Sequence, residues 1–174
     1  PTVNPSPDLS AFLLTLLDMK ILLTGGTGFF GKALLSYHLQ SISSSNREIF
    51  VLSRNPSAFL AAHPEYSKYR SINFLKGDIQ HPDTLPWSHQ FTHVLHAAAD
   101  STIGPSFSPL DHYDQIVDGT RNILDLAVAT GAHRFLLTSS GAIYGPQSDE
   151  LSSIPEDWSG SPSLSLSLIH ISEP

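Results

Sequence analysis

The hydrophobic residues of this chain fall into short, nearly continuous runs that are separated by longer stretches with helical spacing. A short apolar run that ends in small or polar residues is typical of a buried strand in a parallel sheet. Such runs predict strands at residues 20–24, 48–53, 72–75, 93–96 and 134–138. Apolar residues three and four positions apart predict helices at residues 28–40, 56–69 (broken at Pro64) and 111–130.

The two clearest helical segments also show which side chains we expect on their apolar faces. In segment 28–40 the residues at helical spacing are Phe29, Phe30, Ala33, Leu34, Tyr37 and His38. In segment 111–130 the predicted buried stripe consists of Ile116, Ile123, Leu124, Ala127 and Val128. Gly131 follows at the position where a left-handed residue commonly ends a helix.

Strands that alternate with helices predict an α/β fold: a doubly wound parallel sheet with helices on both faces, truncated after about the fifth strand. In such sheets ligands bind beyond the carboxyl ends of the strands. The predicted strands end in small or polar residues, namely Gly25, Ser53–Arg54, Asp78, Ala97–Ala99 and Ser139–Ser140. We therefore expect these five strand ends to border one crevice.

Composition narrows the class of protein. Hydrophobic residues make up 40% and charged residues 14% of the 174-residue chain, which disfavours both a disordered tail and a membrane protein. The net charge of −7 with only nine scattered lysines and arginines disfavours a nucleic-acid surface. The chain has no cysteine, so disulfides and thiolate chemistry are excluded, and a cytoplasmic location is expected. His93 and His96 would point to opposite faces of a strand, so no metal site is expected.

The two ends of the chain differ from the middle. Residues 1–18 are rich in proline and serine and precede Met19, the only methionine, so we expect an upstream extension that is not native. A genuine N-terminal helix over residues 10–18 is the alternative. Residues 159–167 are nearly all serine, leucine, proline and glycine. The last nine residues of the chain, 166–174, resemble a translated transposase mosaic-end sequencing adaptor. We expect residues 19–158 to be the native domain and residues 159–174 to be a non-native tail.

A glycine-rich turn lies between the first predicted strand and the first predicted helix. Residues 24–31 read Thr-Gly-Gly-Thr-Gly-Phe-Phe-Gly, with glycines at Gly25, Gly28 and Gly31. Glycines in this spacing allow a sharp turn, close approach of a pyrophosphate and tight packing of the helix, whose N-terminus favours phosphate. We expect Gly25, Gly28, Phe29, Phe30 and Gly31 to contact a dinucleotide; a tight turn without a ligand is the alternative.

Four motifs in order strengthen this interpretation: residues 24–31, Gly77-Asp78-Ile79, residues 96–101 (His-Ala-Ala-Ala-Asp-Ser) and residues 138–145 (Thr-Ser-Ser-Gly-Ala-Ile-Tyr-Gly). With them the chain resembles the extended short-chain dehydrogenase/reductases, the NAD(P)-dependent sugar-nucleotide epimerase/dehydratase family. The resemblance implies a Rossmann-type fold, a nucleotide-sugar or similar small-molecule substrate and transient hydride transfer. Many relatives form homodimers, so the resemblance also implies a homodimer for the parent protein.

The end of the second strand bears on the choice of cofactor. An acidic residue there would bind the ribose of NAD, but this chain has Ser53 and Arg54, which suit the 2′-phosphate of NADP. NADP is therefore expected, NAD remains possible, and a solvated Arg54 is the alternative. The resemblance places Asp78 and Ile79 beside the adenine, although Asp78 could also cap a turn. Ala97, Ala98 and Ala99 suit a cofactor lying against backbone, or packing alone.

The resemblance also implies a catalytic Ser/Thr, Tyr and Lys. Ser140 aligns with the Ser/Thr, with a serine that only satisfies local backbone as the alternative. The Tyr-x-x-x-Lys pair is absent. The lysines are at positions 20, 32, 68 and 76, so none follows Ser140, and the residue four positions after Tyr144 is Ser148. We therefore expect the parent protein to be an enzyme and this fragment to be inactive.

The reaction subtype is narrowed by two departures from the family pattern. Gly141 and Ala142 stand where dehydratases carry acidic residues, so an epimerase or ketoreductase is favoured over a 4,6-dehydratase. Ile116 stands where many relatives have asparagine, which weakens the prediction that this part of the chain binds the nicotinamide. A non-catalytic dinucleotide-binding regulator of the same fold is the competing function. A chain that folds poorly because its sheet has an unprotected edge is a third possibility.

Overall fold

The computed structural model describes residues 19–40, 47–98, 108–145, 147, 151–158 and 160. Within them the chain forms a five-stranded parallel sheet in the order β3-β2-β1-β4-β5. The strands are β1 (Met19–Thr24), β2 (Arg47–Ser53), β3 (Ile72–Lys76), β4 (His93–His96) and β5 (Arg134–Leu137). The helices are α2 (Phe29–Gln40), α3 (Pro56–Ala62) and α4 (Pro109–Ala129), with 3₁₀ turns η2 (Pro64–Lys68), η3 (Pro82–Thr84) and η4 (Gly141–Tyr144).

Strand β1 lies at the centre of the sheet and is paired on both edges. Leu23 is in register with Val51 of β2 on one side and with Leu95 of β4 on the other. Leu22 and Leu23 are both buried although they point to opposite faces, because helices cover the sheet on both sides. This is why β1 shows an unbroken apolar run rather than an alternating pattern.

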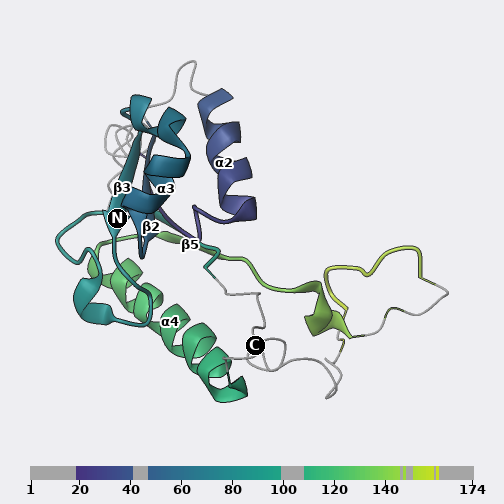
Figure 1. Cartoon of the computed structure of the whole chain (residues 1–174). Helices are drawn as coiled ribbons and strands as arrows, with labels where there is room; N and C mark the ends of the chain where they lie inside the picture. The colour runs from purple at the N-terminus through teal and green to yellow at the C-terminus, as the bar shows by residue number, and fades with distance from the viewer. Residues whose placement is uncertain are drawn as a thin grey trace, which may run out of the picture.

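The helices form two layers around the sheet (Figure 1). On one face, Leu35 of α2 and Phe59 of α3 pack on Leu23 and Val51. On the other face, Ile123, Leu126 and Ala127 of α4 pack on Leu22 and Val94. The predicted α/β architecture, with five parallel strands and helices on both faces, is confirmed.

Helix α4 begins and ends at residues that its sequence makes favourable. The Ser108 hydroxyl oxygen accepts the backbone N–H of Asp111 (3.1 Å), and the Asp111 carboxylate accepts the backbone N–H of Ser108 (3.0 Å). Such a reciprocal cap contributes about 1 kcal/mol. At the other end Gly131 has φ +81°, the left-handed conformation expected of a helix stop.

The predicted buried faces of the long helices are partly wrong. On α4, Ile123 and Ala127 are buried, but Leu124 is 43% and Val128 81% exposed. The side chains that face the sheet follow a narrower stripe, in which the buried positions are Gln115, Gly119, Ile123, Leu126, Ala127 and Thr130. The predicted stripe included the outward-facing Leu124 and Val128 and left out the buried Leu126, because apolar residues stand on more than one side of this helix.

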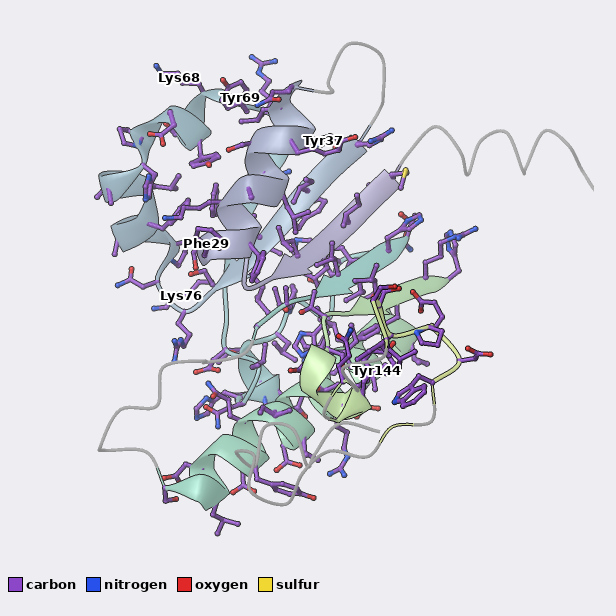
Figure 2. All side chains as sticks on the ribbon, turned by 90° about the vertical axis from the view of Figure 1, so that its right-hand side faces the viewer. Phe29, Tyr37, Lys68, Tyr69, Lys76 and Tyr144 are labelled. Atoms are coloured by element: carbon purple, nitrogen blue, oxygen red, sulfur yellow. The ribbon has the colours of Figure 1, made fainter. Side chains whose placement is uncertain are left out.

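Helix α2 shows the same effect. Leu35 and His38 are buried, whereas Phe29 (81%), Phe30 (73%) and Tyr37 (68%) are exposed. Figure 2 shows Phe29 and Tyr37 on α2, with Phe29 near the end of the helix that follows the glycine turn. Most of the aromatic side chains of α2 therefore do not contribute to the core.

Candidate functional site: a cavity at the carboxyl edge of the sheet

The strand order creates a crevice beside β1. After β1 the chain builds the sheet outward through β2 and β3, and then returns to the other edge of β1 as β4. The helix that follows β1 (α2) and the helix that follows β4 (α4) therefore pack on opposite faces of the sheet, and open α/β sheets bind ligands at such a point. A cavity of about 570 Å³ lies there, a volume in the ordinary range of small-molecule sites.

The glycine turn forms one wall of the cavity. Gly25 has φ +72°, and a Cβ placed on it would lie 2.4 Å from the carbonyl oxygen of Ala97. A Cβ on Gly31 would lie 2.4 Å from the carbonyl oxygen of Gly25. The Gly28 N–H donates to the same carbonyl (3.0 Å) and closes the turn. Glycine is required here because backbone segments touch each other.

Helix α2 begins directly after this turn, at Phe29. The first N–H groups of a helix have no partner within the helix, and they carry the positive end of its dipole. The first turn of α2 contains no acidic residue that would oppose an anion. The glycine turn and the start of α2 therefore fit a phosphate group.

The end of β2 supplies the positive charge of the cavity. Ser53 Oγ accepts the backbone N–H of Asn55 (3.3 Å), and Asn55 Oδ1 accepts the N–H of Ala58 at the start of α3 (3.0 Å). The two side chains that flank Arg54 are thus engaged with local backbone. Arg54 is exposed at the rim, and the residues lining the cavity include a single carboxylate, Asp78.

The end of β3 is held by a local turn and by α4. Asp78 Oδ1 accepts the N–H of Gln80 (3.1 Å), so the turn-capping alternative for Asp78 is observed. The Asn122 side-chain amide donates to the Ile79 carbonyl (2.8 Å). Gly119 faces the Ile79 side chain so closely that a Cβ would lie 2.7 Å from its Cδ1. Helix α4 therefore fixes the Asp78–Ile79 segment at the cavity.

The end of β4 is tied to the end of β1. The Thr24 hydroxyl oxygen accepts the backbone N–H groups of Ala97 (3.1 Å) and Ala98 (3.2 Å). His96 lies beneath them, 2% exposed, and burial lowers the pKa of its imidazole from 6.5 to about 4. A neutral histidine therefore supports this wall of the cavity at physiological pH.

Gln115 is a site residue that sequence reasoning missed. It lies on the sheet-facing side of α4, is 6% exposed and lines the cavity. Its Oε1 has no hydrogen-bond partner among the described residues. A buried acceptor without a partner is costly unless a ligand or water donates to it. Together with the glycine turn, this amide oxygen fits a cavity built for a polar ligand such as a dinucleotide.

The structure brings most of the predicted cofactor residues together. Those that line the cavity are Gly25, Gly28, Phe29, Phe30, Gly31, Ser53, Arg54, Asp78, Ile79, Ala97 and Ala98. Ala99 lies outside the described residues. The lining residues that were not among the predicted contacts are Thr24, Thr27, Leu52, Asn55, Phe59, Gly77 and Gln115; of these, Thr24, Thr27 and Gly77 belong to the predicted motifs. For Gln115 the available signal was a polar residue within the apolar stripe of a helix.

Ser140 is not among the residues that line this cavity. It is half-buried and lies between β5 and η4, in a stretch that runs away from the sheet (Figure 1). Tyr144 ends η4, and Figure 2 shows Lys68 and Lys76 well apart from it. No lysine follows Lys76 in the sequence. The described residues after Ser140 therefore include no lysine.

The described part of the chain has neither a metal-binding cluster nor a membrane-spanning helix. It contains no group of three or more histidine, cysteine, aspartate or glutamate side chains that could hold a metal ion. His96 faces Thr120 of α4, so His93, three residues earlier on the strand, faces the other side of the sheet. Nor do its helices include one long and apolar enough to cross a membrane.

The sequence of this chain is similar to that of proteins from one known family. The model of the NAD dependent epimerase/dehydratase family matches residues 21–163. UDP-glucose 4-epimerase of Klebsiella pneumoniae is 27% identical over 135 residues, which cover 74% of this chain and 94% of the relative. UDP-glucose 4-epimerase 2 of Oryza sativa subsp. japonica is 32% identical over 133 residues, which cover 72% of this chain and 32% of the relative.

Among solved structures, dTDP-glucose 4,6-dehydratase from Bacillus anthracis in complex with NAD has a TM-score of 0.68 at 24% identity. The match covers 88% of this chain and 47% of that one. The chain thus spans about a third of the rice relative and under half of the dehydratase. At this identity the structural likeness shows the shared fold.

Proposed function

This chain belongs to the NAD dependent epimerase/dehydratase family, and from that premise we propose that it is the dinucleotide-binding part of a nucleotide-sugar epimerase or reductase. The observation that carries the proposal is the cavity at the carboxyl edge, where residues from the ends of β1, β2, β3 and β4 meet. Relatives named UDP-glucose 4-epimerase favour a nucleotide sugar as the substrate class.

Each wall of the cavity has a separate role in this proposal. The glycine turn and the start of α2 hold the pyrophosphate, since backbone N–H groups meet it there. Asp78 and Ile79 border the adenine, and Ala97 and Ala98 provide a flat backbone wall. The bound dinucleotide supplies the hydride acceptor. The side chains of this chain orient it and exclude water from it.

We propose NADP rather than NAD as the preferred dinucleotide. The end of β2 offers the guanidinium of Arg54 and no carboxylate, which suits a 2′-phosphate and lacks the usual ribose ligand of NAD. The Bacillus anthracis structure contains NAD, so the preference has to be measured on this chain.

The test is a fluorescence titration of the purified chain with NADPH and with NADH. We expect NADPH to bind roughly tenfold more tightly, because a hydrogen bond to a charged group contributes about 1.5 kcal/mol, which corresponds to about a factor of ten in Kd. Arg54→Gln should abolish the preference, whereas Arg70→Gln, an exposed arginine outside the cavity lining, should leave it intact. Tighter binding of NADH by the wild type would overturn the proposed role of Arg54.

Ser140 is proposed as the catalytic Ser/Thr hydroxyl that orients the substrate oxygen. Because it does not line the dinucleotide cavity, its role concerns the sugar and not the cofactor. Ser140→Ala should therefore leave the Kd for NADPH unchanged. Without a lysine after Ser140, we expect the chain to bind dinucleotide but not to interconvert UDP-glucose and UDP-galactose. Measurable turnover by the chain would contradict this.

A homodimer of the parent protein is also proposed. The outward face of α4 exposes Leu110, Tyr113, Leu124 and Val128 to between 41% and 81%. Apolar side chains on the solvent side of a helix suit a second copy of the same helix. Sedimentation of wild type and Val128→Lys at matched concentration would decide, since only the wild type should form dimers.

A further inference from the structure

Three polar side chains from three different elements meet beneath the cavity. Thr24 Oγ1 lies 2.6 Å from His96 Nδ1, and His96 Nε2 lies 3.2 Å from Thr120 Oγ1. Thr24 ends β1, His96 ends β4 and Thr120 belongs to α4. Thr24 and His96 are 0% and 2% exposed, so water does not compete for the contact between these two side chains.

The donors and acceptors of this chain of contacts can be assigned from geometry. Backbone N–H groups only donate, and those of Ala97 and Ala98 both donate to Thr24 Oγ1. The hydroxyl has two lone pairs, so its single hydrogen is left for His96 Nδ1. His96 Nδ1 must then accept, and a neutral imidazole carries its proton on Nε2. Nε2 therefore donates to Thr120 Oγ1.

This arrangement fixes three walls of the cavity relative to one another. Thr24 is followed directly by Gly25, which packs against the Ala97 carbonyl. Ala97 and Ala98 follow His96 and line the cavity. Thr120 lies on the same helix as Gln115, which also lines the cavity. A shift of the imidazole would thus change the spacing of all three walls.

We propose that His96, as the neutral imidazole protonated on Nε2, is a positioning residue for the dinucleotide. The inference rests on the proposed function, because it assumes that the cavity binds that ligand. Histidine suits the position because one rigid ring offers an acceptor to Thr24 and a donor to Thr120. Asparagine can replace the acceptor at the Nδ1 position, and glutamine can replace the donor at the Nε2 position, but neither replaces both.

The two substitutions separate the two contacts. The contact with Thr24 holds the Ala97–Ala98 backbone, so His96→Asn should keep the Kd for NADPH within about threefold of wild type. His96→Gln leaves the Thr24 hydroxyl without its acceptor and should raise the Kd roughly tenfold. The matched control is Thr92→Val, because the Thr92 hydroxyl also links β1 to β4, through Lys20, at the opposite end of the sheet. It should leave the Kd unchanged.

Nitrogen-15 NMR of histidine-labelled wild type gives a second readout that needs no ligand. We expect His96 to show an unprotonated Nδ1 and a protonated Nε2 at neutral pH, with His96→Asn identifying the signals. A protonated Nδ1, or equal Kd values for wild type and His96→Gln, would overturn the inference. A wild type that bound neither NADPH nor NADH would instead overturn the proposed function.

Discussion

Strands β1 and β5 have similar sequences and very different surroundings. Both contain two adjacent leucines, yet Leu22 and Leu23 of β1 are 0% and 2% exposed, whereas Leu136 and Leu137 of β5 are 55% and 37% exposed. In the described part of the chain β1 pairs with a strand on each edge and β5 pairs with β4 alone. The comparison shows that the strand leading into the glycine turn is held by the core on both faces, whereas Ser140 follows a poorly covered strand.

The largest expected difference between the two regions concerns glycine. Gly31→Ala places a Cβ 2.4 Å from backbone atoms of the glycine turn, whereas the matched change Gly141→Ala meets no atom within 4 Å. Backbone cannot yield as a side chain can, so we expect Gly31→Ala to lower the free energy of unfolding by about 4 kcal/mol or more. Urea denaturation measures both variants.

Gly141→Ala is the control, and it should stay within about 0.5 kcal/mol of wild type. Similar losses for the two variants would mean that the glycine turn is not as tightly packed as the structure has it.

The next difference concerns the leucines themselves. Leu22→Ala removes a fully buried side chain from the core between β1 and α4, and should cost about 3–4 kcal/mol of unfolding free energy. Leu136→Ala removes a half-exposed side chain and should cost less than about 1 kcal/mol. If thermal denaturation gave Leu136→Ala the larger loss, β5 would be covered in solution by something that buries it.

The smallest of the three effects depends on pH and on His96. The unfolded chain protonates this histidine below pH 6.5, whereas burial holds the pKa in the folded chain at about 4. The unfolded state therefore binds more protons between these values, and stability must fall as the pH falls from 6.5 to 4. The loss from this one group amounts to about 3 kcal/mol at most.

Stability is measured from pH 7 down to pH 4 for wild type and for His96→Asn, which cannot take up this proton. The difference between the two curves isolates the contribution of His96 from that of the carboxylates. Parallel curves would show that His96 is not buried as a neutral group.

Much of the fold could be predicted from local pattern. Each of the five strands was found at the predicted position to within one or two residues, because a short apolar run closed by glycine or polar residues has few other structural solutions. The buried face of α4 could not be predicted fully, because Leu124 and Val128 are apolar and still point outward. Which side of a helix meets the sheet depends on contacts far away in the sequence.

The residues of the candidate site also differ in whether local sequence could predict them. The glycine turn and Arg54 were found because the residues that matter are adjacent in sequence and follow a strand. The contact of Thr24 with His96 joins residues that are 72 positions apart, and the sequence around either residue does not indicate its partner. Gln115 was missed although it lies at helical spacing from Gly119 and Ile123, because the stripe was predicted to run through Ile116 and Leu124 instead.

The central place of β1 has a consequence for synthesis on the ribosome. Its pairing with β2 joins Met19 to Arg47, but its pairing with β4 has to wait for residues 93–96. At about 5–20 residues per second, translation leaves the second edge of β1 open for a few seconds after the first has closed. During that interval a very apolar strand presents free N–H and C=O groups, so nascent chains emerging close together have an opportunity to pair wrongly.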